Sequence, residues 1–148
     1  MPRNGQIRVE PDREPRLQVA ALPWRRTPDG VEVLLITSRE SRRWVIPKGW
    51  RMKGLGSGQA AEQEAFEEAG VRGELSRRKL GAFHYDKRLR SGRVQRVKVA
   101  VFALKVLSED PYYPEADQRE KLWTGPAAAA DLVQEPELAD LLRSFAPK

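Results

Sequence analysis

Short stretches of alternating and clustered apolar residues predict that the first fifty residues fold mainly as strands. These stretches are rich in β-branched and aromatic residues and cover residues 17–24, 31–38 and 42–50. Pro28, Asp29 and Gly30 are turn formers between the first two stretches, so we expect a hairpin or two neighbouring strands there. Pro47 and Gly49 end the third stretch, which is predicted to be one short apolar strand.

A helix is predicted for residues 59–69, where helix-forming residues follow a glycine-rich loop. Gly70 supplies the left-handed residue at which such a helix typically ends. With about 100° of rotation per residue, one side of this helix is small and apolar and should lie closely on a sheet. That side consists of Ala61, Ala65, Phe66 and Ala69.

A second hairpin is predicted farther along the chain. Two extended segments, residues 79–89 and 93–107, flank Ser91 and Gly92, which favour a tight turn. The hairpin is strongly basic, because it contains most of the cations of the middle of the chain. We therefore expect an exposed, positively charged ribbon.

The last part of the chain is predicted to contain a loop, a short strand and closing helices. Residues 108–120 are rich in loop-forming residues, and residues 121–124 favour a short strand. Residues 125–146 favour one or two helices, since Pro126 suits a first helical turn and Pro136 marks a break.

Strands mixed with one early and one late helical region predict an α/β or α+β sandwich. Residues 1–16 lack hydrophobic periodicity and are expected to be a flexible tail. Residues 17–148 show no internal repeat and no linker, so we expect a single domain.

Composition narrows the classes of function. The 148 residues contain no cysteine, which excludes disulfides, thiolate metal sites and a cysteine nucleophile. The N-terminus lacks the apolar core of a signal peptide, and no stretch approaches the roughly 20 apolar residues of a membrane span. The expectation is a soluble, cytoplasmic protein without a membrane partner.

The formal net charge of +6 is unevenly distributed. Residues 75–100 contain nine Lys or Arg and one acidic residue, whereas residues 109–148 contain nine acidic and four basic residues. Such a basic middle suggests an anionic partner, either phosphates or nucleic acid. The alternative is that these charges simply form a solvated surface.

Three carboxylates, Glu64, Glu67 and Glu68, crowd the end of the predicted helix. Glu64 and Glu68 form a like-charged i,i+4 pair that costs a few tenths of a kcal/mol. Negative charge near a helix C-terminus opposes the macrodipole by roughly 0.3 to 1 kcal/mol. A divalent cation would turn this repulsion into attraction, because magnesium takes carboxylate oxygens as ligands. A solvated acidic helix face is the alternative for the acids taken alone.

The whole window resembles the Nudix box, whose general form is G, five residues, E, seven residues, then R-E-apolar-x-E-E-x-G-apolar. The matching positions are Gly49, Glu64, Ala65, Glu67, Glu68, Gly70 and Val71. Two positions depart from the pattern, because Leu55 replaces the loop glutamate and Gln63 replaces the arginine. In the family these two residues commonly form an internal ion pair, and exchanging both for uncharged residues can be nearly neutral.

The resemblance implies a Nudix-type α/β/α sandwich with a mixed sheet, a catalytic helix and C-terminal helices. Over residues 17–145 the chain is similar to Nudix hydrolases, most of all to the branch with diphosphoinositol polyphosphate and diadenosine polyphosphate hydrolases. The implied reaction is attack of water on a diphosphate bond, with Mg²⁺ or Mn²⁺ as cofactor. The implied substrate is an anionic phosphorylated small molecule.

The resemblance also assigns roles to residues. Glu64, Glu67 and Glu68 match the catalytic, metal-binding acids, with Glu64 favoured as the general base and the carbonyl of Lys48 as a further ligand. Another acid usually comes from a loop outside the box; Glu115, Asp117 and Glu120 are the options, and Glu120 is preferred because it precedes the strand-like residues 121–124.

Basic residues around the box and in the hairpin are candidates for binding substrate phosphates. They are Arg39, Arg43, Lys48, Arg51, Lys53, Arg88 and Arg90, and Arg42, Arg93 and Arg96 lie in the same segments. His84 is expected to pack or lie at the surface, Trp44 to lie in the core, and Ser57 to be a loop or capping residue. A module that binds RNA or a nucleotide through the basic hairpin, without turnover, is the competing hypothesis.

Overall fold

The computed structural model describes residues 15–148, so most of the predicted tail, residues 1–16, lies outside the described residues. Within the described part, eight strands and three helices follow one another along the chain. They are β1 (Arg16–Thr27), β2 (Gly30–Thr37), β3 (Trp44–Val45), β4 (Lys48–Trp50), α1 (Ser57–Ala69), β5 (Val71–Leu75), β6 (Gly81–Arg88), β7 (Val94–Glu109), β8 (Lys121–Thr124), α2 (Pro126–Leu132) and α3 (Pro136–Arg143).

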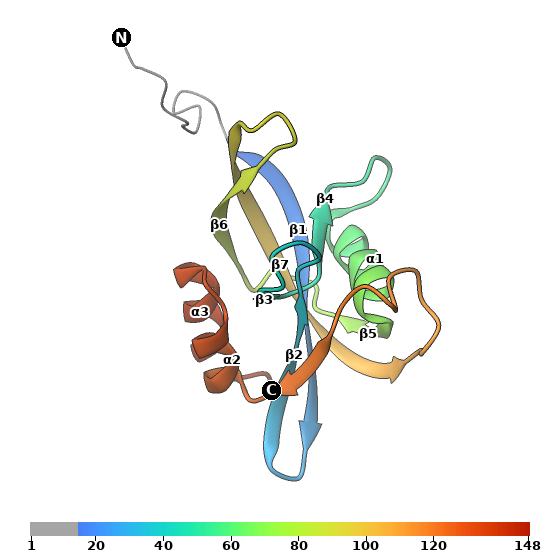
Figure 1. Ribbon diagram of the computed structural model, residues 1–148. Helices are drawn as coiled ribbons and strands as arrows, with labels where there is room; N and C mark the ends of the chain where they lie inside the picture. Colours follow the sequence, from blue (N-terminus) through green and yellow to red (C-terminus); the bar gives the residue numbers. More distant parts are fainter. Residues whose placement is uncertain (1–14) are drawn as a thin grey trace.

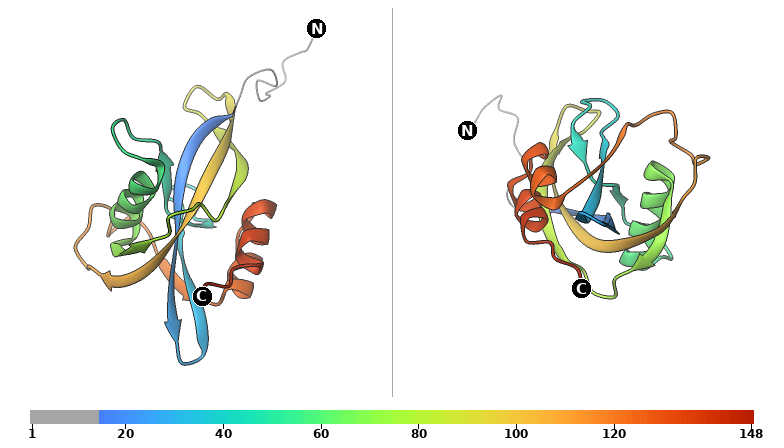
Figure 2. Two further views of the ribbon diagram at one scale, coloured as in Figure 1. Left: turned by 180° about the vertical axis from the view of Figure 1, so that it is seen from behind. Right: turned by 90° about the horizontal axis from the view of Figure 1, so that it is seen from below.

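The strands form one mixed sheet that lies between two helical layers, as the predicted α/β/α sandwich requires (Figure 1). Helix α1 covers one face, and α2 with α3 covers the other, an arrangement that Figure 2 shows from behind and from below. In the part of the chain that the structure describes, no helix is long and apolar enough to cross a membrane.

A parallel pair, β1 and β7, runs through the middle of the sheet with its register from Arg16↔Val97 to Trp24↔Lys105. At one end of this pair, β4 and β6 are the antiparallel neighbours. At the other end, β2 and β5 take those places. Strand β2 leaves β1 after Val33 and pairs with β8 and β3, so the sheet splits beside β4.

Alternation along β1 builds both cores. Ala20, Leu22 and Trp24 face the α2–α3 layer, where they pack with residues such as Phe83. Val19 and Ala21 face α1. This period of two is what a strand buried on both faces requires.

Most predicted elements are confirmed, including the β1–β2 hairpin, the turn before Val94, the short strand β8 and two closing helices that each begin at proline. Gly70 ends α1 with φ 70°, as predicted. The single strand predicted for residues 42–50 is in fact two short strands, because Pro47 separates β3 from β4. Strand β5 was not predicted from its short sequence.

The alanine face of α1 is confirmed, since Ala61, Ala65 and Ala69 are fully buried against the sheet. Phe66 was expected on the same face, and this was wrong. It is only half-buried, and the Arg72 guanidinium lies 3.8 Å from its ring centroid. At about 100° per residue, Phe66 lies at the edge of the alanine face. The alanine methyl groups already contact the sheet, so the space between helix and sheet is too narrow for the Phe66 ring.

We predict that Phe83→Ala lowers the free energy of unfolding by about 3 to 5 kcal/mol, because it removes a ring that is 1% exposed in the core. Leu107→Ala is the matched control, since Leu107 is 65% exposed and should change stability by less than about 0.5 kcal/mol. Urea denaturation measures both values. Equal losses in the two variants would contradict this description of the core.

Candidate functional site

A cleft of about 470 Å³ opens where the sheet splits, beside the C-terminal half of α1. Its wall combines acidic residues of α1 and the 110–120 loop with cations of β4, β6 and the 38–43 loop. The residues that line it include Gln18, Arg39, Arg43, Lys48, Gly49, Glu64, Glu68, Tyr85, Arg88, Glu115 and Arg119.

The Glu64 carboxylate lies directly over the Cα atom of Gly49 in β4. A Cβ atom at residue 49 would fall inside van der Waals contact with all three atoms of that carboxylate group. The backbone of Gly49 has no positive φ, so glycine is required here by space and not by conformation. The first glycine of the box therefore makes room for the first acid of the helix.

Glu68 is the most buried of the three helix acids, with 7% exposure. Its Oε1 accepts a hydrogen bond from the Lys48 backbone N–H at 3.3 Å. Its Oε2 lies 3.6 Å from Nη2 of Arg119. These partners hold the carboxylate at the floor of the cleft.

Arg119 is a buried cation that links the helix to the loop before β8. Its Nε donates to Oε1 of Glu115 at 2.7 Å, and its Nη1 donates to the Thr37 carbonyl at 3.0 Å. Only 8% of the Arg119 side chain is exposed. Arg119 was not predicted as a site residue, although its position between Glu115 and Glu120 gives it acidic neighbours in the sequence.

Burial and like charge act together on the acids of the cleft. Burial, then the charge of Glu68 and a hydrogen bond between the two carboxyl groups, raise the pKa of Glu64 to about 8. Burial also raises the pKa of Glu68, although the Arg119 guanidinium opposes this rise. Without a bound metal, Glu64 and Glu68 therefore share a proton near neutral pH. A cation bound between their carboxylates would displace this proton.

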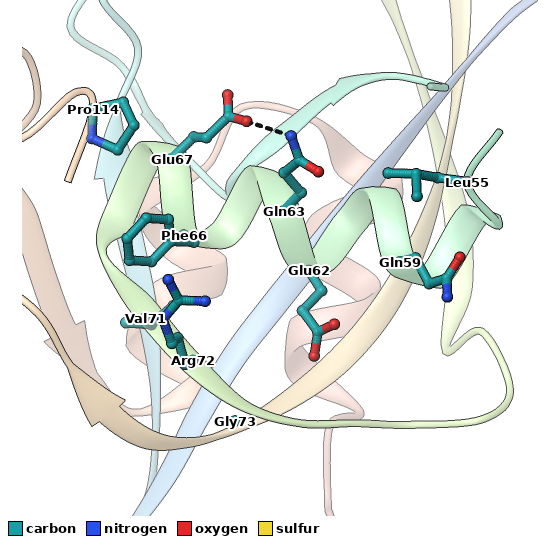
Figure 3. A pocket seen from close by; sticks show the side chains of 10 residues that line it. All are labelled: Leu55, Gln59, Glu62, Gln63, Phe66, Glu67, Val71, Arg72, Gly73 and Pro114. Carbon is teal, nitrogen blue, oxygen red and sulfur yellow. Dashed lines mark hydrogen bonds between the residues drawn. The ribbon is translucent and has the colours of Figure 1, made fainter. Parts of the chain in front are cut away.

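Glu67 does not line the cleft with this pair but lies farther round α1. Its Oε2 accepts a hydrogen bond from Nε2 of Gln63 at 2.8 Å, and Figure 3 shows the two side chains next to each other on the outer surface of the helix. Both line a separate hollow of about 720 Å³ that also includes Leu55, which is 37% exposed. The two residues that depart from the box thus lie at this outer hollow, not in the cleft.

The arrangement fits a hard divalent ion. Among residues 15–148, no three His, Cys, Asp or Glu side chains converge as a ready-made metal site. Magnesium commonly binds through one or two carboxylates, together with water and substrate phosphates. Glu64 and Glu68 supply such a pair, and Glu115 lies on the same wall. The metal-binding role of Glu67 and of the Lys48 carbonyl stays a prediction.

Glu120, preferred as the outer acid, does not reach the cleft. Its side chain is 68% exposed and pairs with Nη2 of Arg42 at 3.1 Å. Glu120 directly precedes β8, which pairs with β2, and it lies outside the cleft lining, so this geometry does not favour it as a metal ligand. Glu115, whose backbone N–H donates to the Glu67 carbonyl, lines the cleft instead.

The predicted phosphate-binding cations divide into two groups. Arg39, Arg43, Lys48 and Arg88 line the cleft. Arg51, Lys53 and Arg90 are exposed and lie outside its lining. Arg51 and Lys53 belong to the loop after β4 and Arg90 to the tip of the β6–β7 hairpin, two segments that project from the body of the sheet (Figure 1).

Three other expectations concern single residues. His84 lies at the surface, where its backbone N–H donates to Glu137 of α3 at 2.7 Å. Trp44 is partly buried and packs against the core, as predicted. Ser57 is the first residue of α1, but the cap is Gly56.

The chain resembles known proteins in sequence over part of their length. No protein-family profile matches it. It is 32% identical to Nudix hydrolase 4 of Arabidopsis thaliana over 116 residues, which are 78% of this chain and 54% of the plant protein. It is 40% identical over 80 residues to human diphosphoinositol polyphosphate phosphohydrolase 3-beta, which is 53% of this chain and 46% of the human protein. The chain thus spans about half the length of these relatives.

Solved structures share the fold. The Ap4A hydrolase binary complex of C. elegans aligns with a TM-score of 0.64 at 22% identity, covering 86% of this chain and 93% of that one. A NUDIX hydrolase from Nitrosomonas europaea aligns with a TM-score of 0.67 at 20% identity, covering 88% and 87%. At this identity the likeness concerns the fold alone.

The raised pKa of Glu64 predicts a pH-dependent stability in protein without added metal. A carboxyl whose folded-state pKa exceeds its ordinary value of 4.5 stabilises the fold at low pH and loses that contribution as pH rises through about 8. Each pKa unit corresponds to roughly 1.4 kcal/mol. Solvent reaches Glu64 and screens the effect, so we expect a loss of about 1 to 2 kcal/mol between pH 5 and 8.

Urea denaturation at several pH values measures this loss. Glu64→Gln should flatten the pH dependence, because its amide does not titrate. A wild-type protein whose unfolding free energy rises over this window, relative to Glu64→Gln, would contradict the shared-proton description.

Proposed function

Because the chain belongs to the Nudix hydrolase superfamily, we propose that it hydrolyses a diphosphate bond in an anionic phosphorylated small molecule, using Mg²⁺ or Mn²⁺. The observation that carries this proposal is the close pair of Glu64 and Glu68 in a cleft that also contains several cations, among them Arg39, Arg43, Lys48 and Arg88. The relative named for diphosphoinositol polyphosphates, which is 40% identical over 53% of this chain, supports substrates with several phosphates.

The acidic and the basic residues of the cleft have different proposed roles. Glu64 and Glu68 would hold the divalent ion, and Glu115 is the proposed outer acid in place of Glu120. The bound ion would neutralise phosphate oxygens and acidify a water molecule. Glu64, whose carboxylate lies over Gly49, is proposed to accept the proton of the attacking water at one of its Oε atoms.

The cations orient the substrate. Arg39 and Arg43 enter the cleft from the 38–43 loop and Arg88 from the end of β6, so they can bind phosphates that lie beyond the reacting bond. Tyr85 donates its hydroxyl proton to Oε1 of Gln18 at 2.8 Å, and burial raises its pKa to about 12. It stays protonated at neutral pH and closes the side of the cleft without adding charge.

We predict that Glu64→Gln and Glu68→Gln each lower kcat by about 100- to 10,000-fold, because each removes a carboxylate from the reacting centre. Glu62→Gln is the matched control on the same helix, since Glu62 lines only the outer hollow. The assay uses dinucleoside polyphosphates, inositol pyrophosphates, ADP-ribose and 5′-triphosphate RNA, with and without Mg²⁺.

The same panel decides between the enzyme and the binding module. Product formation that needs the metal and both carboxylates supports the enzyme. Salt-sensitive RNA binding with no turnover would instead support a module that binds through the basic hairpin.

Gly49→Ala should separate folding from activity. Its Cβ must displace the Glu64 carboxylate, so we expect hydrolysis to fall by at least about tenfold. The flexible end of Glu64 can move, so the melting temperature should change by only a few degrees. Gly56→Ala is the control, because its Cβ would meet only Oε1 of Gln59 at 3.7 Å. Full activity in Gly49→Ala would contradict the proposed role of Glu64.

A further inference from the structure

Glu135 is a buried acid that the proposed chemistry does not use. It precedes Pro136 at the start of α3 and is 8% exposed. Its Oε1 is buried and has no hydrogen-bond partner within residues 15–148. A buried polar atom without a partner commonly costs about 1 to 3 kcal/mol, so an uncharged residue would be less costly here.

The other oxygen of Glu135 holds an arginine of the cleft. Nη1 of Arg43 donates to Oε2 of Glu135 at 3.2 Å and to Oε1 of Gln134 at 3.0 Å. Nε of Arg43 donates to Oγ of Ser41 at 3.2 Å. In the described part of the chain, Nη2 of Arg43 has no hydrogen-bond partner. The α2–α3 turn therefore holds Nη1 of the guanidinium, Ser41 holds Nε, and Nη2 is left unengaged by the described residues.

Glu135 also acts on the lysine of the same wall. Burial lowers the pKa of Lys48, and the charges of Glu68 and Glu135 oppose this fall. Nζ of Lys48 lies 5.1 Å from the centroid of the Tyr85 ring, which faces the cleft. The Glu135 carboxylate thus interacts with two cations that line the cleft, Arg43 and Lys48.

We propose that Glu135 is a positioning residue that holds Arg43 so that Nη2 of Arg43 binds a substrate phosphate beyond the reacting bond, with Lys48 as a second cation of the same cleft. Glu135 itself does not touch the substrate. The proposal rests on the proposed function, and it makes the α2–α3 turn part of the machinery that selects substrates by their number of phosphates. An arginine that is already oriented loses less side-chain freedom when it binds phosphate.

Inorganic tripolyphosphate is the binding probe, and isothermal titration calorimetry in the presence of Mg²⁺ measures its Kd. Glu135→Met keeps the side-chain volume and removes both oxygens, so we expect Kd to rise about tenfold. Glu135→Gln keeps one acceptor for Arg43 and should restore part of the affinity. Arg43→Ala should cost as much as Glu135→Met, and the double variant should be no weaker than Arg43→Ala alone.

Glu137→Met is the matched control on the same helix, because the Glu137 side chain is 52% exposed and contacts His84 outside the cleft. It should leave Kd unchanged. With a hydrolysed substrate, Glu135→Met should raise KM by about tenfold while kcat stays within about twofold, a division that mere loss of folded protein does not produce.

Wild-type affinity in Glu135→Met, or losses that add in the double variant, would overturn the positioning role even if hydrolysis is intact. Tripolyphosphate binding that depends on Glu135, in a protein that hydrolyses nothing in the panel, would support the role and reject the hydrolase. A wild-type protein that neither binds tripolyphosphate nor hydrolyses any substrate would overturn both.

Discussion

The close approach of α1 to the sheet is the constraint on which the cleft depends. Ala60, Ala61, Ala65 and Ala69 are fully buried and present only methyl groups to the strands. A larger residue on this face would lift the helix away from the sheet. At the present separation, Glu64 reaches over Gly49, and Glu68 reaches the backbone of Lys48. The positions of the two acids therefore follow from the packing of the adjoining alanine face of the same helix.

This packing concentrates negative charge at a helix end, and the loop before β8 compensates for it. Arg119 brings a buried positive charge to Glu68 and Glu115. The backbone N–H groups of Asp110 and Glu115 donate to carbonyls of Gly70 and Glu67, which satisfies acceptors at the end of α1. A buried ion cluster of this kind contributes little net stability, but it fixes the geometry of its members.

Local patterns predicted the strands, the main helix and its stop, because turn residues and apolar periodicity act over a few residues. Glu64 and Glu68, which match the box, line the cleft, and their catalytic role stays a prediction. Contacts between distant segments were not predictable in the same way. The role of Arg119 depends on how the 110–120 loop crosses α1, and the outward turn of Glu120 depends on the register of β8. The placement of Glu67 depends on a neighbour one helical turn away, Gln63, which departs from the family pattern.

The parallel pair β1 and β7 runs without interruption through the whole sheet. Because each strand crosses from one half of the split sheet to the other, neither half can separate while these two remain paired. The rim of the cleft and the far end of the β1–β2 hairpin are thereby mechanically joined. We therefore expect local unfolding only in the loops and strand ends that border this pair, whereas β1 and β7 separate only when the whole protein unfolds.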